Sequence, residues 1–160
     1  MLSRRLLIPL LIALALAFLV AAIGGALTDT GPWFRALAKP SWQPPDAAFG
    51  PVWTTLYALI AASAALGWRD AGEGGGNRAM LVALFVLNGI LNIGWSYLFF
   101  HLRWPMGALV EIAILWVSIV ALIAFLWRFS RRSALLLLPY LAWVSFAAAL
   151  NGAIVQLNPA

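Results

Sequence analysis

The chain alternates between long apolar runs and short polar segments. Five of the runs have the length of about 20 residues that a helix needs to cross the hydrocarbon core of a bilayer. The predicted membrane-spanning helices cover residues 6–27, 49–68, 79–100, 105–127 and 133–157. Short turns join most of them, so neighbouring helices are expected to be antiparallel. The pattern predicts an all-α integral membrane protein: a five-transmembrane-helix bundle, one domain over residues 1–160, with a structured Trp/Pro-rich loop between the first two helices.

Composition supports a lipid environment. Of the 160 residues, 64% are hydrophobic and 9% are charged, whereas soluble domains carry about 25% charged residues. The first run follows Arg4 and Arg5, as in a signal peptide, but it is longer than a signal-peptide core, so we expect a retained anchor. The absence of Cys excludes disulfides, and a single His argues against a metal site.

The basic residues are scattered between the apolar runs, although the net charge is +5. No basic patch or recognition motif is present, so the sequence argues against nucleic-acid binding. One side of the predicted bundle carries seven basic residues and the other carries three. The larger set, on the side of the N-terminus, is Arg4, Arg5, Arg69, Arg78, Arg128, Arg131 and Arg132. The smaller set, on the opposite side, is Arg35, Lys39 and Arg103. In a bacterial cell membrane, this asymmetry places the N-terminus in the cytoplasm.

The loop before the second predicted helix is rich in aromatic residues and proline. Proline fixes φ and removes a backbone donor, so the loop is expected to be stiff. Tryptophan combines a large apolar face with one N–H group, which suits a membrane interface or a planar ligand. We expect the loop to form a lid, whose residues include Trp33, Lys39, Pro40, Trp42 and Pro45.

Three predicted helices carry polar and aromatic residues on one face, at helical spacing. On the second predicted helix the face holds Trp53 and Tyr57, and on the third it holds Asn88, Asn92 and Trp95. On the fifth predicted helix it holds Tyr140, Trp143, Ala147 and Asn151. Facing one another, they would line an aromatic cavity with a few hydrogen-bonding groups, the usual make-up of a small-molecule pocket. The alternatives are that the asparagines tie helices together and that the tryptophans anchor the helix ends at the membrane interface.

Glu111 is the one acidic residue well inside an apolar run. A carboxyl group in this position is a candidate proton relay or cation partner. The alternative is a protonated or water-reached side chain that is hydrogen-bonded near the interface. No catalytic motif is present, and we predict no catalytic residue.

Three separated motifs resemble the TspO/translocator protein family, also called tryptophan-rich sensory proteins or peripheral benzodiazepine receptors. The first is W-F-x-x-L-x-K-P-S-W-x-P-P followed by F-G-P-V-W-T-x-L-Y, over residues 33–57. The others are L-N-x-x-W-S-x-x-F-F at residues 91–100 and P-Y-L-A-W-V-S-F-A-A-x-L-N at residues 139–151. The resemblance implies a five-helix protein, usually dimeric, that binds porphyrins such as protoporphyrin IX and benzodiazepine-type drugs.

The ligand-binding positions implied by the resemblance largely coincide with the faces described above. They are Phe34, Pro44, Trp53, Tyr57, Asn88, Asn92, Trp95, Trp143 and Ala147. Phe34 stands where Tyr is commoner in the family, and Asn88 stands where many members have Gln. The C-terminal segment lacks the aromatic and basic residues of the family's cholesterol-recognition motif, which argues against sterol transport.

Together these features predict a membrane binding or sensory protein for tetrapyrroles, with porphyrin as ligand and no required cofactor. The alternatives are light- and oxygen-dependent porphyrin breakdown and transport of hydrophobic ligands. The expected partners are the ligand, membrane lipid and a second copy of the chain. Candidate dimer contacts are the small-residue stripes Ala17/Ala21/Gly25, Ala79/Ala83 and Ala148/Gly152.

Overall fold

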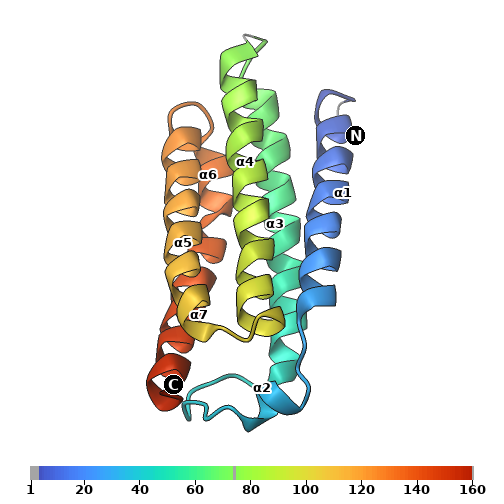
Figure 1. Cartoon of the computed structure of the whole chain (residues 1–160). Helices are drawn as coiled ribbons and strands as arrows, with labels where there is room; N and C mark the ends of the chain where they lie inside the picture. Colours follow the sequence, from blue (N-terminus) through green and yellow to red (C-terminus); the bar gives the residue numbers. More distant parts are fainter. Residues whose placement is uncertain (1–3, 74, 160) are drawn as a thin grey trace.

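The computed structural model describes residues 4–73 and 75–159, and within them the regular structure is helical. Five helical segments are long and apolar enough to cross a membrane, which confirms the predicted fold class (Figure 1). The elements are α1 (Arg4–Leu27), α2 (Pro32–Ala36), a 3₁₀ turn (Asp46–Ala48), α3 (Phe49–Asp70), α4 (Gly75–Ser96), a π-helical turn (Tyr97–His101), α5 (Pro105–Trp127), α6 (Arg131–Leu136) and α7 (Leu138–Leu157).

The five spans close into a ring of neighbours. Helix α1 packs on α3 and α4, α4 packs on α5, α5 packs on α6 and α7, and α6 returns to α3. Figure 1 shows α2 and the C-terminus at one end of the bundle and the N-terminus at the other. Four buried residues of α5 run through the centre, each at most 2% exposed: Leu115, Ile119, Leu122 and Leu126.

The observed helix bounds differ most from the predicted ones at three places. Helix α4 begins at Gly75 instead of residue 79, because a helix can start with polar residues outside the hydrocarbon. Its predicted last turn is the π-helical Tyr97–His101. The last span is split at Leu137, two residues before Pro139, whose missing N–H removes one helical hydrogen bond.

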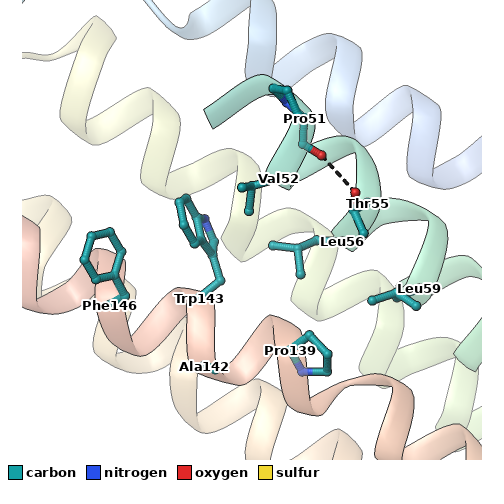
Figure 2. Close-up of a pocket in the computed structure, with 9 residues that line it drawn as sticks. All are labelled: Pro51, Val52, Thr55, Leu56, Leu59, Pro139, Ala142, Trp143 and Phe146. Atoms are coloured by element: carbon teal, nitrogen blue, oxygen red, sulfur yellow. Dashed lines mark hydrogen bonds between the residues drawn. The ribbon is translucent and has the colours of Figure 1, made fainter. Parts of the chain in front are cut away.

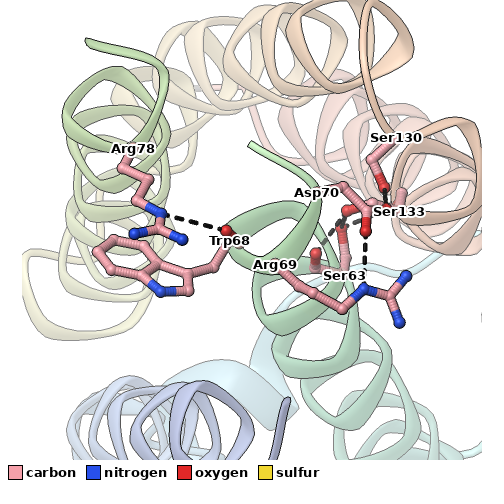
Figure 3. A network of polar contacts seen from close by, with 7 residues as sticks. All are labelled: Ser63, Trp68, Arg69, Asp70, Arg78, Ser130 and Ser133. Carbon is pink, nitrogen blue, oxygen red and sulfur yellow. Dashed lines mark hydrogen bonds and ion pairs between the residues drawn. The ribbon is translucent and has the colours of Figure 1, made fainter. Parts of the chain in front are cut away.

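Helix α6 is fixed to α3 by a buried polar clamp (Figure 3). The Ser63 hydroxyl donates to the Ser133 carbonyl at 2.9 Å, and the Ser133 hydroxyl donates to the Ser63 carbonyl. Nearby, the Asp70 carboxylate accepts a hydrogen bond from the Ser130 hydroxyl at 2.6 Å and pairs with Arg69 at 2.7 Å. These contacts hold the first part of the last span independently of α7.

Helix α1 contacts both α3 and α4 but buries little of its own side-chain surface. Only Gly24 is buried along Arg4–Leu27, and most of its large apolar side chains are exposed to the surroundings of the bundle. In a membrane those side chains contact lipid.

Candidate ligand-binding site

The lid loop is docked on the aromatic residues of the π-helical turn. Phe34 is buried and packs against Phe100, with ring centroids 5.5 Å apart. Trp33 meets Phe99 edge-on at 6.0 Å. The Lys39 ammonium lies 3.9 Å from the centroid of the Phe34 ring, a cation–π contact. The loop is therefore closed onto the bundle.

The other predicted lid residues lie farther out. Pro40 and Pro44 are half-buried and Pro45 is exposed. Trp42 is 49% exposed, but its ring meets Phe146 of α7 edge-on at 5.7 Å. The loop thus spans from α4 to α7 across one end of the bundle.

A latch at the end of α7 holds the middle of the loop. The side-chain oxygen of Asn158 accepts from the Ala38 N–H at 2.9 Å. Its side-chain nitrogen donates to the Ala38 carbonyl at 2.9 Å and to the Ile154 carbonyl at 2.8 Å. One amide side chain therefore satisfies both backbone groups of a loop residue 120 positions away.

We expect Asn158→Leu to release the loop, because it removes two hydrogen bonds worth about 1 kcal/mol each. Hydrogen exchange of the Ala38 amide should accelerate by about tenfold or more. The matched control is Asn77→Leu, at an exposed position near the opposite end of the bundle. Unchanged exchange at Ala38 in Asn158→Leu would show that the latch does not hold the loop.

A hydrogen-bonded ladder crosses the middle of the bundle and joins α3, α4, α5 and α7. The Tyr57 hydroxyl donates to the Asn92 side-chain oxygen at 2.8 Å, and the Asn92 nitrogen donates to the Tyr140 hydroxyl at 3.1 Å. Tyr140 donates to the Asn88 oxygen at 3.2 Å, and the Asn88 nitrogen donates to the Ser118 hydroxyl at 2.8 Å. The structure thus brings three of the predicted ligand-binding residues together and links them to Tyr140 and Ser118.

Two predicted tryptophans belong to the packing around this ladder. Trp53 stacks on Tyr57 with centroids 5.4 Å apart. The Trp95 indole N–H donates to the Asn151 side-chain oxygen at 3.1 Å, and the Asn151 nitrogen donates to the Pro105 carbonyl at 2.9 Å. The amide of Asn151 therefore ties α4, the start of α5 and α7 together.

Trp143 lies apart from the ladder, beside a groove between α3 and α7 (Figure 2). The groove has a volume of about 590 Å³. It is lined by Pro51, Val52, Thr55, Leu56, Leu59, Pro139, Ala142, Trp143 and Phe146. The Trp143 indole N–H is buried and has no hydrogen-bond partner among the described residues. Ala147, one turn further along α7, is half-buried against the core.

A second cavity, of about 610 Å³, lies between α1, α3 and α4. Its lining is apolar except for Tyr57, Asn88, Asn92 and Tyr140. The predicted ligand-binding residues are therefore distributed over two hollows and the packed aromatic region between them. The sequence had suggested that they line one shared cavity. Their roles as ligand contacts stay predictions.

Glu111 is buried, at 9% exposure, on the side of α5 that faces α4. Its Oε1 lies 3.6 Å from the place where a Cβ on Gly94 would be. Both carboxyl oxygens are without a hydrogen-bond partner within the described part of the chain. Within the described residues nothing supplies the hydrogen bond that the interfacial alternative includes, and a role of Glu111 as proton relay or cation partner stays a prediction.

The sequence model of the TspO/MBR family matches residues 11–157, which include the loop, the ladder and Trp143. The chain belongs to the TspO/MBR family. With its five apolar spans it is an integral, multi-pass membrane protein.

Relatives of this TspO/MBR chain occur in bacteria, archaea and animals. It is 43% identical to "Tryptophan-rich protein TspO" of Chlorobaculum tepidum over 131 residues, 79% of this chain and 80% of the relative. It is 38% identical to the protein of the same name from Archaeoglobus fulgidus, over 92% of this chain and 96% of the relative. Identity to "Translocator protein" of Homo sapiens is 36%, over 74% of this chain and 70% of the relative. Membership of the TspO/MBR family supports a ligand-binding or sensory role in the membrane.

Sequence reasoning missed three residues of this region. Ser118 ends the ladder, but a single serine in an apolar helix gives no signal of its partner. Asn158 lies in the tail, where nothing indicates a contact with the loop. Phe146 lies three residues after Trp143, inside the third motif, and this spacing could have placed both rings on one side of α7.

Proposed function

We propose that this TspO/MBR protein binds tetrapyrroles such as protoporphyrin IX, or other planar hydrophobic ligands, in the groove between α3 and α7. The observation that carries the proposal is the buried indole N–H of Trp143, which has no partner among the described residues and lies beside a mainly aliphatic groove that Trp143 and Phe146 line with their rings. A buried N–H without a partner is rare and calls for an explanation. A ligand acceptor would supply the missing hydrogen bond.

The surroundings of the groove suit a planar macrocycle. The rings of Trp143 and Phe146 lie 5.4 Å apart and offer stacking surfaces. Trp42 of the lid loop contacts Phe146, so the loop reaches the edge of the groove. Arg35 belongs to α2 and Lys39 follows shortly after it, and α2 lies at the loop end of the bundle (Figure 1). Both residues would supply positive charge there for the ligand's propionates.

Binding is proposed in preference to porphyrin breakdown or transport. The nine residues that line the groove supply rings, aliphatic groups and one hydroxyl, and none of them is an acid or a base. The groove therefore offers no general acid–base chemistry, and breakdown driven by light and oxygen, which needs no such groups, is kept as the alternative. A ligand-binding or sensory role requires only affinity for the ligand, which the aromatic and aliphatic side chains of the groove can provide through apolar contacts.

The test is a titration of the detergent-solubilised protein with protoporphyrin IX, followed by the shift of the porphyrin absorption band. Trp143→Phe keeps an aromatic ring and removes the N–H, so we expect binding to weaken by about tenfold, the value of one good hydrogen bond. The control is Trp127→Phe, because Trp127 is exposed at the far end of α5. Equal affinity in Trp143→Phe would exclude this groove, and a wild-type protein without saturable binding would exclude the function.

We also propose a bacterial cell-membrane location with the N-terminus in the cytoplasm, on the basis of the distribution of basic residues. The lid loop then lies on the outer side.

We also propose that the protein forms a homodimer. It is supported by the small-residue stripe Ala17/Ala21/Gly25 of α1, in which Gly25 is exposed and the two alanines are half-buried, because small residues permit close helix approach.

A further inference from the structure

The cavity between α1, α3 and α4 is elongated along the helix axes. On α1 its lining extends from Ile8 to Val20, a helical rise of roughly 18 Å. On α3 it extends from Tyr57 to Trp68, a rise of roughly 16 Å. One leaflet is about 15 Å thick, half of the hydrocarbon core of a bilayer. The cavity therefore has the length of one leaflet, and Ile8 and Trp68 mark its outer end, where the N-terminus lies (Figure 1).

The long wall of the cavity is apolar and opens sideways to the bilayer. Ile8 and Ile12 of α1 line it and are 57% and 56% exposed, and Val82 of α4 lines it and is 48% exposed. The polar residues at its inner end, such as Tyr57 and Asn92, are hydrogen-bonded to one another in the ladder. An occupant therefore enters from the lipid and needs only a hydrocarbon chain along this wall.

An arginine is fixed over the outer end of the cavity. The Arg78 guanidinium lies 4.8 Å from the ring of Trp68, a lining residue, and its Nε donates to the Trp68 carbonyl at 3.4 Å (Figure 3). Leu81 and Val82, one turn further along α4, line the cavity. The cation–π contact and the hydrogen bond thus hold a positive charge directly above the apolar wall.

Helix α1 adds two more arginines at the same end. Arg4 and Arg5 stand one turn before the lining residues Ile8 and Pro9, so they share the face of α1 that borders the cavity. Both arginines are exposed. In the described part of the chain, neither they nor Arg78 form an ion pair with a carboxylate.

The acidic residues of this end do not neutralise the three arginines. Asp70 pairs with Arg69 and accepts from Ser130, on the side of α3 that faces away from Trp68 and Arg78 (Figure 3). Glu73 is exposed in the turn before α4 and forms no ion pair with any arginine among the described residues. The outer end of the cavity is therefore positively charged and suits an anion.

We propose that this cavity binds an anionic phospholipid such as phosphatidylglycerol, with one acyl chain along the apolar wall and its phosphate at Arg78 and the arginines of α1. Arginine binds phosphate through two parallel hydrogen bonds, and basic residues at the membrane surface favour anionic lipids. A zwitterionic lipid carries a cationic group that the arginines repel, and free phosphate has no chain for the wall. The site is independent of the proposed tetrapyrrole groove, because the residues lining the two hollows do not overlap.

The test is native mass spectrometry of the detergent-solubilised protein, titrated with dioleoyl phosphatidylglycerol or with dioleoyl phosphatidylcholine, which has the same chains. We expect one phosphatidylglycerol to bind with an affinity about tenfold or more above that of phosphatidylcholine. Glycerol 3-phosphate, which has the charge but no chains, should not displace it. Equal affinity for the two lipids would show a hydrocarbon contact only and would overturn the proposal, as would displacement by glycerol 3-phosphate.

A pair of arginine variants tests the position of the phosphate. Arg78→Gln should lower the affinity for phosphatidylglycerol by about fivefold, the value of one basic residue at the membrane surface, and leave that for phosphatidylcholine unchanged. The matched control is Arg128→Gln, because Arg128 follows α5 at the same end of the bundle, where its guanidinium lies 6.0 Å from the Phe125 ring. Equal losses in the two variants would show a general effect of surface charge and would overturn the proposal.

A second pair of variants tests the position of the acyl chain. Ala64→Phe fills the cavity from α3 and should abolish the preferred phosphatidylglycerol site. Ala58→Phe, at an exposed position of the same helix, should retain it. Binding that survives Ala64→Phe would overturn the proposal, and if this variant does not fold, the arginine pair still decides. Trp143→Phe should bind phosphatidylglycerol like the wild type, so failure of the tetrapyrrole proposal leaves this one standing.

Discussion

The Gly67→Val variant is expected to lose about 3 kcal/mol of stability, the upper end of the usual cost of overpacking. A Cβ at this position would lie 2.7 Å from Leu126 Cδ2 and 3.2 Å from the Ser133 hydroxyl. Leu126 is fully buried and Ser133 belongs to the clamp between α3 and α6, so neither can move aside without disturbing the core. The loss is measurable as a lower midpoint in an SDS titration of the micellar protein.

The control for this prediction is Gly25→Ala. Nothing lies within 4 Å of a Cβ built on Gly25, and replacing a helical glycine by alanine normally gains about 0.5–1 kcal/mol. The two glycines should therefore respond with opposite signs. A Gly67→Val protein as stable as the wild type would mean that α3, α5 and α6 are not packed as described.

The second large effect is expected for Tyr140→Phe. The Tyr140 hydroxyl accepts from Asn92 and donates to Asn88, and the residue is 1% exposed. Its removal leaves two amide groups without these bonds in a place that water does not reach. Leaving a buried polar group unsatisfied costs about 1–3 kcal/mol, so we expect a loss of about 2 kcal/mol in the same titration.

Tyr57→Phe provides the comparison within the same ladder. The Tyr57 hydroxyl donates one hydrogen bond and stands at the end of the ladder, on a half-buried side chain. We expect a loss of about 0.6 kcal/mol, the average for single hydrogen bonds between membrane helices. If the two variants lose equal stability, the ladder does not act as a connected unit.

The sequence was sufficient to predict the spans, because a run of about 20 apolar residues matches the length of a helix that crosses the hydrocarbon core of a bilayer. It was also sufficient to place Asn88 and Asn92 on one face of α4, since four residues make about one helical turn. It did not predict the split at Leu137 or the π-helical turn at Tyr97–His101. Next to the split, the Ser133 carbonyl accepts a hydrogen bond from the Ser63 hydroxyl of α3, and the π-helical turn is closed by backbone bonds of its own segment, such as Leu102 N–H to the Tyr97 carbonyl. Residue spacing indicates neither of these bonds.

The division of the predicted site into two hollows also lay beyond the sequence. Helical spacing puts Tyr140 and Trp143 near one another on α7, but the rotation of α7 against α3 decides what each faces. In the structure Tyr140 joins the ladder, while Trp143 lies beside the α3–α7 groove and packs on Phe49 at 5.6 Å. Helix rotation is set by packing, which a single sequence does not specify.

The composition of the ladder bears on how the protein is assembled in the membrane. Its members come from α3, α4, α5 and α7, and among the described residues no side-chain hydrogen bond joins α1 to another helix. The hydrogen bonds of the ladder can form only after the four later spans have been inserted and lie side by side. Helix α1 takes no part in these bonds and can pack against the other helices afterwards. We therefore expect α1, which is synthesised before the other four spans, to be the last of the five to take up its final position.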